Sequence, residues 1–289
     1  MNDLLQLLWA PFLMCLVLTG IHAYLGLHVI ARGIVFVDIA LAQIAALGAT
    51  AAFLFGYGLD SWVSYVSALG ATLLGALVFA LTRGDQRHFS QEAVIGVVYA
   101  VSAAAAVLLV DRAPHGGEHL RVMMVGNILT VSGAEVVKVG ALYASIGVVH
   151  WLCRRPFFRI SFDPAWAAQS RGDVRRWDFL FYATFGVVVT SSVRIAGVLL
   201  VFSYLIVPAL AAVALATGVS RRLVIGWAFA ALVSVIGITT SATFDLPTGA
   251  TVVCAFGVML LATGVVARLT SVASGSRQAR RPAQRGSQM

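Results

Sequence analysis

Charged side chains are scarce in this sequence of 289 residues. Asp, Glu, Lys and Arg make up 11% of it and hydrophobic residues 60%, with a mean hydropathy of +0.92. A soluble domain carries roughly 25% charged residues, so the composition excludes a soluble globular chain. Because a helix needs about 20 apolar residues to cross a bilayer, we predict an all-α polytopic membrane protein. Its transmembrane domain covers residues 1–268, without a separate soluble domain.

Lysine is almost absent, and so are two enzyme motifs. The one lysine, Lys138, follows Val137, whereas the ATP-binding P-loop requires Gly-Lys-Ser/Thr, and no HExxH zinc motif is present. The three cysteines, Cys15, Cys153 and Cys254, lie far apart without a CxxC pair, and we expect small buried side chains there. The chain is therefore predicted to be no enzyme and to hold no covalently bound cofactor.

About nine apolar runs are candidates for membrane spans. The seventh contains Pro208, which lacks a backbone donor, so we expect a broken helix around Pro208. Broken helices are tolerated at depth beside protein or a water-filled path, which makes Ser203, Tyr204 and Pro208 candidates for the path. Whether this run spans once or is re-entrant stays open. The runs comprise residues 4–26, 34–55, 62–81, 93–110, 134–153, 179–193, 195–217, 223–244 and 250–267.

The net charge of +8 comes from arginines in the loops and at the C-terminus. Cytoplasmic loops are enriched in Arg and Lys, so the N-terminus is predicted outside and the C-terminus inside. The basic residues then meet anionic membrane lipid and not nucleic acid. Residues 269–289 are predicted to form a basic, disordered cytoplasmic tail. The loops assigned to the cytoplasm are 27–33, 83–91, 154–177, 218–222 and 268–289.

One carboxylate, Asp38, lies well inside an apolar run. An acid at that depth costs several kcal/mol unless it faces protein, water or a cation. Asp38 is therefore a candidate metal ligand on a translocation path, and the alternative is a structural acid paired with Arg32 or a helix N-terminus. Gln43 follows on the same predicted helix. It either lines the path or ties two helices together through an amide hydrogen bond.

An outward-facing loop gathers imidazoles and carboxylates. His115 and His119 lie near Asp111 and Glu118, and these side chains suit zinc or a similar ion. They are candidates for metal capture at the mouth of the path, and the alternative is an ordinary solvated loop.

Six segments in order resemble the permease subunits of bacterial metal-uptake ABC transporters, the zinc/manganese/iron ABC-3 family. The resemblance implies an inner-membrane homodimeric channel for a divalent metal, powered by a separate cytoplasmic ATPase and fed by a periplasmic solute-binding protein. The six segments are residues 36–48, QEAVIGVVY (91–99), VGNILTVS (125–132), FDPAWAAQSRG (162–172), RIAGVLLVFSYLIVPALAA (194–212) and FDLPTGAT (244–251).

The first segment departs from the family pattern Asp-x-x-x-His. Gln43 stands where the histidine is expected, Ile39 stands four residues before it, and the acid has moved to Asp38. Asn127 likewise replaces the acid of the family's third segment. An amide oxygen is a poorer ligand for zinc than an imidazole and suits harder ions better, so the sequence leaves the metal open.

We place the contact with the ATPase at residues 162–172, because a short helix outside the bilayer can fit a groove on a partner through its apolar face. Phe162 and Trp166 are candidate apolar anchors, Asp163 and Pro164 are a plausible helix start, and Gly172 ends the segment. The alternative is an interfacial loop held at headgroup level by tryptophan.

Two functions compete at this point. The first is an ABC-importer permease for a metal ion or metal chelate. The second is an ion-coupled secondary metal transporter, which usually needs several acids inside the membrane, whereas only Asp38 lies well inside a span.

Overall fold

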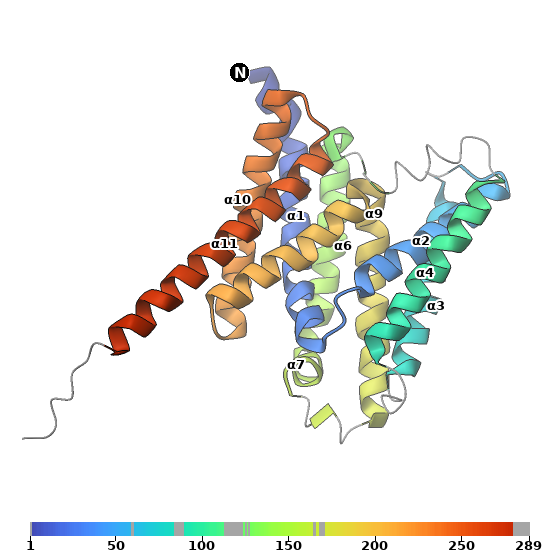
Figure 1. Cartoon of the computed structure of the whole chain (residues 1–289). Helices are drawn as coiled ribbons and strands as arrows, with labels where there is room; N and C mark the ends of the chain where they lie inside the picture. Colours follow the sequence, from blue (N-terminus) through green and yellow to red (C-terminus); the bar gives the residue numbers. More distant parts are fainter. Residues whose placement is uncertain are drawn as a thin grey trace, which may run out of the picture.

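The computed structural model describes residues 2–58, 61–83, 90–112, 124, 126, 128–163, 166–167 and 171–279 (Figure 1). These residues form helices and contain no strand, which confirms the predicted all-α class. The helices are α1 (Asn2–Arg32), α2 (Val37–Leu54), α3 (Trp62–Thr82), α4 (Gln91–Val110), the 3-10 helix η1 (Ile128–Thr130), α6 (Gly133–Leu152), α7 (Arg154–Phe162), α9 (Arg171–Leu215), α10 (Val219–Phe244) and α11 (Thr248–Ala279).

Eight of the described helices are long and apolar enough to cross a membrane. One of them, α9, is not continuous, because at Gly197 the backbone has a φ of 75° and a ψ of 159°. This break divides α9 into two helices, of which the first contains the predicted run 179–193 and the second lies within the predicted run 195–217. With α9 counted as two, the described helices correspond to the predicted set of about nine spans.

The break lies at Gly197 and not around Pro208, which corrects the sequence prediction. Pro208 is buried inside the second part of α9, where the helix continues. A positive φ costs glycine almost nothing, whereas a side chain there costs about 1–2 kcal/mol. Gly126, itself at a φ of 66°, packs against the backbone of Ala196 and Gly197 so closely that a Cβ would overlap it. The break in α9 thus lies where Gly126 packs against its backbone.

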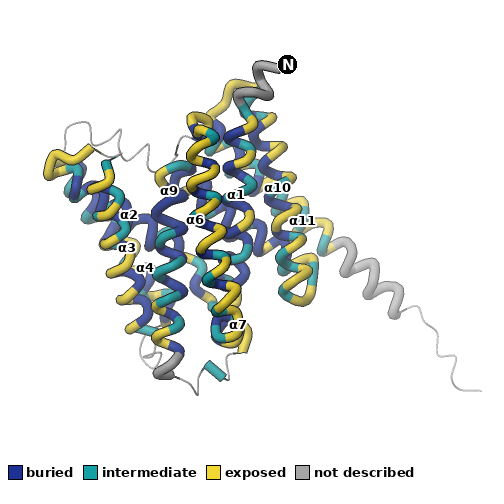
Figure 2. The backbone as a smooth tube through the Cα atoms, turned by 180° about the vertical axis from the view of Figure 1, so that it is seen from behind, coloured by how far each residue is buried: buried dark blue, intermediate teal, exposed yellow. Residues whose placement is uncertain are grey.

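The helix α2 is the most deeply enclosed of the described spans. It contacts α3, α4 and α9, and 72% of its apolar window is buried, against 11% for α11. Figure 2 shows the buried backbone in the interior of the bundle and the exposed backbone along its outer helices. Apolar residues on those outer faces are expected where lipid covers a helix.

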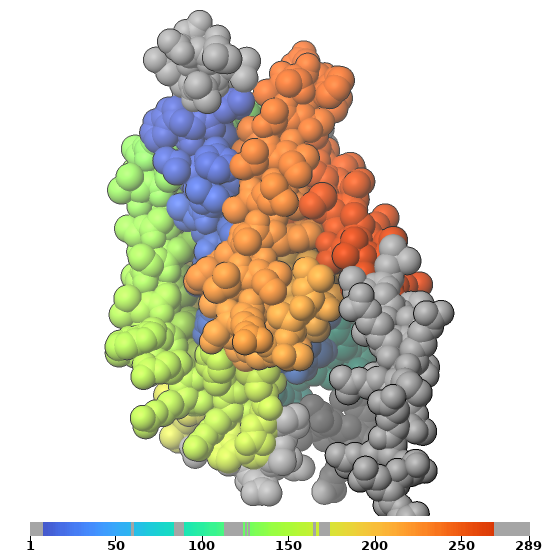
Figure 3. Space-filling model, turned by 90° about the vertical axis from the view of Figure 1, so that its left-hand side faces the viewer, coloured from blue at the N-terminus to red at the C-terminus, as the bar shows by residue number. Residues whose placement is uncertain are grey.

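The helix α1 packs in the other half of the bundle. It contacts α6, α7, α9 and α10, and Figure 3 shows α6, α1 and α10 side by side on one face, with α7 at its lower end. Gly26 lies so near the Leu205 carbonyl that an added Cβ would overlap it. Small residues allow membrane helices this close approach.

Serine side chains cap the starts of α3, α4 and α6, whereas α2, α7 and α10 begin without a side-chain cap. The Ser90 Oγ accepts a hydrogen bond from Ala93 N at 3.2 Å, and Glu92 lies in the first turn of α4. The helix α11 continues through residues 269–279 of the predicted disordered tail. An existing helix can extend because its nucleation cost is already met. Residues 280–289 lie outside the described residues.

Candidate functional site

The link between α1 and α2 brings Asp38 to the start of α2. Gly33, at a φ of 66°, turns the chain at the end of α1, and Figure 1 shows the link running back along the bundle before α2 begins. Phe36 N donates to Glu92 Oε1 of α4 at 3.3 Å, which holds the point where α2 starts. Asp38 is in the first turn of α2, where the helix dipole favours a negative charge.

The Asp38 carboxylate is buried and has few compensating contacts. Only 1% of the residue is exposed, and Oδ1 has no hydrogen-bond partner within the described part of the chain. Arg32 is not its partner, because Arg32 Nη1 donates to Asp178 Oδ1 at 2.9 Å. Of the two structural partners predicted for Asp38, Arg32 is thus excluded and the N-terminus of α2 remains. An uncompensated carboxylate at this depth costs several kcal/mol, and a passing cation would compensate it.

Gln43 is buried further along the same helix, with 8% of the residue exposed. Its amide forms no hydrogen bond among the described residues, so the predicted tie between two helices is not seen there. Five residues rotate a regular helix by 500°, which puts Asp38 and Gln43 about 140° apart. Both are buried because α2 has neighbours on several sides. The two side chains therefore do not form one ligand pair on a single helix face.

A buried polar cluster, which the sequence did not predict, joins α1, α6 and α9. The Tyr143 hydroxyl donates to Val188 O at 3.3 Å and accepts from Ser191 Oγ at 3.2 Å. The His22 Nε2 lies 3.3 Å from Ser192 Oγ. His22 is fully buried, which agrees with a packed histidine. Ser191 and Ser192, consecutive serines inside a predicted apolar run, are the sequence feature that could have indicated this cluster.

The three candidates on the second part of α9 do not meet Asp38. The Tyr204 hydroxyl lies 2.6 Å from Ser234 Oγ of α10, and its ring lies 5.0 Å from that of Phe256 in α11. Ser203 Oγ donates to Leu199 O of its own helix at 2.9 Å. Pro208 is buried beside Gly226 of α10. The contacts of Tyr204 bind α9 to α10 and α11, and the place of all three residues on a path stays a prediction.

The described part of the predicted ATPase-contact segment lies beside α7. Asp163 Oδ1 accepts a hydrogen bond from Trp166 N at 3.1 Å, the geometry expected of a helix start. Phe162 ends α7 with 37% of the residue exposed, and the Trp166 ring lies 5.6 Å from the Arg159 guanidinium carbon. Pro164 lies outside the described residues, and Gly172 is in the first turn of α9.

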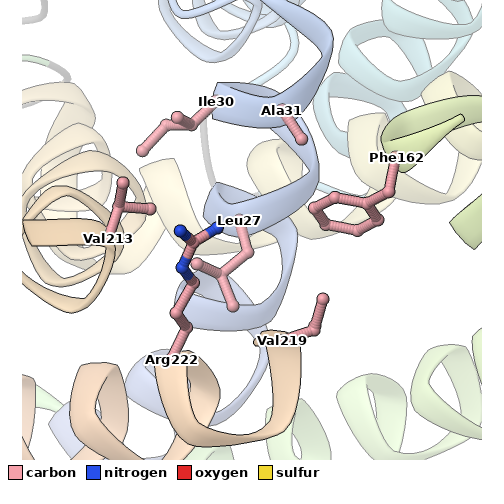
Figure 4. A pocket seen from close by; sticks show the side chains of 7 residues that line it. All are labelled: Leu27, Ile30, Ala31, Phe162, Val213, Val219 and Arg222. Carbon is pink, nitrogen blue, oxygen red and sulfur yellow. The ribbon is translucent and has the colours of Figure 1, made fainter. Parts of the chain in front are cut away.

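Phe162 also lines a small pocket at this end of the bundle. Figure 4 shows side chains from α1, α7, α9 and α10 around it, with Arg222 extending across Leu27. Arg222 Nε donates to Ala216 O at 2.9 Å, which holds the guanidinium at the pocket. The pocket joins the start of the predicted ATPase-contact segment to the α9–α10 turn. Its lining residues are Leu27, Ile30, Ala31, Phe162, Val213, Val219 and Arg222.

His115, His119 and Asn127 lie outside the described residues. Among the residues that the structure does describe, no three His, Cys, Asp or Glu side chains come together as a metal cluster. Of the three metal candidates predicted from the sequence, Asp38 is the one that lies in the described part of the chain.

Known proteins resemble this chain in both sequence and fold. The "Probable metal transport system membrane protein" of Chlamydia muridarum is 24% identical over 239 residues, covering 79% of this chain and 82% of that protein. The manganese transport system membrane protein MntC of Halalkalibacterium halodurans is 22% identical over 229 residues, covering 79% of this chain and 76% of that protein. The structure of PsaBC from Streptococcus pneumoniae in complex with Fab matches with a TM-score of 0.74 and 21% identity, over 91% of this chain and 93% of the other.

The family comparison covers nearly the whole bundle. The ABC 3 transport family matches residues 4–267, a range that includes all the candidate residues above and ends inside α11. The described helices and the related sequences agree with this match. The chain belongs to the ABC 3 transport family, and it is a multi-pass membrane protein of the ABC-transporter permease type.

Proposed function

We propose that this chain is the permease subunit of an ABC importer for a divalent metal ion or a small metal chelate. It acts in the bacterial inner membrane, with its N-terminus outside and its C-terminus inside. Two copies form the channel as a homodimer. A separate cytoplasmic ATPase drives transport, and a periplasmic binding protein delivers the metal. The family membership and the metal-transport names of the relatives support this proposal.

The observation that carries the proposal is that Asp38 is buried and is not paired with Arg32. Its carboxylate is buried in the most enclosed described span, and Arg32, the cation nearest in sequence, is bound to Asp178. A permease for anions or apolar solutes has no use for such a group, whereas a cation path needs a ligand that is not already paired. Asp38 is thus the proposed metal-contacting residue.

The ligand chemistry favours a hard divalent ion. A carboxylate oxygen suits manganese better than it suits zinc, which prefers imidazole or thiolate. Gln43 stands where the family pattern has histidine, so this position supplies no imidazole, and three relatives are named for manganese transport. We therefore place manganese first among the metals to be tested, ahead of iron and zinc.

Reconstitution tests the function directly. The purified permease, its ATPase and its binding protein are placed in lipid vesicles, and uptake of manganese, iron and zinc is measured with and without ATP. Metal accumulation that requires both ATP and the ATPase supports the proposal. Accumulation by the permease alone, driven by a proton or sodium gradient, would instead establish the secondary transporter.

Trp166→Glu is expected to weaken ATPase binding by about 30-fold, because truncating an aromatic anchor costs about 2 kcal/mol and a charge cannot enter an apolar groove. Co-purification of the ATPase with the tagged permease measures the effect. Trp62→Glu is the matched control, since Trp62 is exposed at the opposite end of α3 from Arg83. Equal ATPase recovery with both variants would remove Trp166 from the contact.

A further inference from the structure

Two buried charged side chains and one partly buried one meet at the end of the bundle near α7. Arg32 Nη1 and Arg83 Nη1 both donate to one oxygen, Asp178 Oδ1, at 2.9 Å and 2.6 Å. The side chains of Arg32 and Asp178 are fully buried, and that of Arg83 is 16% exposed. Arg32 ends α1, Arg83 follows α3, and Asp178 belongs to α9. The cluster therefore ties three spans together at one carboxylate.

The pairing in this cluster is incomplete. Two positive groups share one negative group, while Asp178 Oδ2 and Arg32 Nη2 have no hydrogen-bond partner among the described residues. A buried ion network gains stability only when its geometry and hydrogen bonds are complete, and its best-attested use is to specify one register or switch between two. A carboxylate with a second oxygen available can change partners without first becoming unpaired.

The two arginines are held to different degrees. Arg32 Nε also donates to Ser161 Oγ of α7 at 2.8 Å, and its guanidinium lies 3.8 Å from the centre of the Phe181 ring. Arg83 makes its described ion pair with Asp178 alone and is the more exposed of the two. Water can replace Asp178 at Arg83 more readily than at Arg32. Arg83 is therefore the partner that can be released.

The cluster lies between the proposed ATPase contact and the helix of Asp38. Asp178 is seven residues, or about 10 Å along a helix, after the start of α9, which follows the segment 162–172. Arg32 leads through the link 33–36 into α2, and the α3 helix that ends beside Arg83 packs along α2. A displacement at the start of α9 would move Asp178 and therefore act on both of its partners. Arg32 leads into α2, and Arg83 follows α3, which packs along α2.

We propose that release and recapture of Arg83 by Asp178 couples the ATPase-contact segment to α2, with Arg32 as the fixed partner. In the present structure both pairs are closed. When the start of α9 moves, the Arg83–Asp178 pair opens and α3 separates from α9 at this end. Because α3 packs along α2, α2 can then change its position. Asp178 and Arg83 are positioning residues in this scheme. The inference rests on the proposed function, because it presumes an ATPase at that segment.

The first test measures ATP hydrolysis and metal uptake in the same vesicles, with the complete transporter. Arg83→Gln is expected to hydrolyse ATP at or above the wild-type rate, while uptake per ATP falls at least about tenfold. Arg83→Lys keeps the charge and is expected to recover a large part of the coupling. Arg221→Gln is the matched control, since Arg221 is exposed at the start of α10 and should leave uptake per ATP unchanged.

The outcomes separate this inference from the proposed function. If Arg83→Gln keeps the wild-type uptake per ATP, the release scheme is wrong. A parallel loss of hydrolysis, uptake and protein yield would show that Arg83 only stabilises the fold, and this also overturns the scheme. If the wild-type complex itself shows no ATP-dependent uptake, the proposed function fails instead.

A distance measurement keeps the inference testable even if Arg83 variants fold poorly. Nitroxide labels are placed at Thr82→Cys and Arg175→Cys, on α3 and α9, after replacement of the native cysteines. The distance distribution between the labels is compared in the complete transporter with and without a non-hydrolysable ATP analogue. A nucleotide-dependent shift supports the opening of α3 from α9, and an unchanged distribution contradicts it.

Discussion

Asp38→Asn, and likewise Asp38→Ala, should lower ATP-dependent metal uptake at least about 100-fold while the protein stays folded in the membrane. Unit charges 4 Å apart attract by about 4 kcal/mol at an effective dielectric constant of 20, and a dication is attracted more strongly. Loss of even 2.8 kcal/mol corresponds to about 100-fold. Thermal stability should not fall, because the substitution removes a buried carboxylate whose Oδ1 has no described partner.

The measurement pairs vesicle uptake with a melting temperature for each purified variant. Asp245→Asn is the matched control, because Asp245 is exposed, and its left-handed conformation, at a φ of 51°, is one that asparagine tolerates. Normal uptake by Asp38→Asn would exclude Asp38 from the path. Loss of uptake together with a large fall in melting temperature would indicate a structural acid.

Gly126→Ala should prevent accumulation of folded protein. A Cβ at Gly126 would overlap the backbone of Ala196 and Gly197, and the residue has a φ of 66°. The left-handed conformation costs alanine about 1–2 kcal/mol, and a backbone overlap adds more because no flexible side chain can move aside. Severe single substitutions exceed about 4 kcal/mol, which is comparable to the whole stability of a domain.

Detergent-solubilised protein is assayed by size-exclusion chromatography and thermal unfolding. Gly96→Ala provides the comparison, because nothing lies near its added Cβ and alanine favours a helix over glycine by about 1 kcal/mol. We expect Gly96→Ala to be neutral or stabilising. A Gly126→Ala protein that melts at the wild-type temperature would show that the contact at the α9 break is not tight.

Local signals predicted much of the fold. Apolar runs have the length that a bilayer requires, so the spans could be recognised without any knowledge of their neighbours. The start of α4 at Ser90 and the turn at Asp163 follow from side chains that bond the backbone a few residues away. The site was less predictable, since the partner of Arg32 is Asp178, 146 residues further along the chain.

The sequence by itself determined that this chain is a helical membrane protein with an acid inside one span, because hydropathy and helix starts depend on neighbouring residues. Only the tertiary structure decided that α9 breaks at Gly197, that Asp38 is not paired with Arg32, and that Asp178 binds two arginines. Each of these depends on contacts between segments far apart in the chain. Such contacts are selected by packing in the folded bundle, where close approach and burial decide which partner a side chain meets.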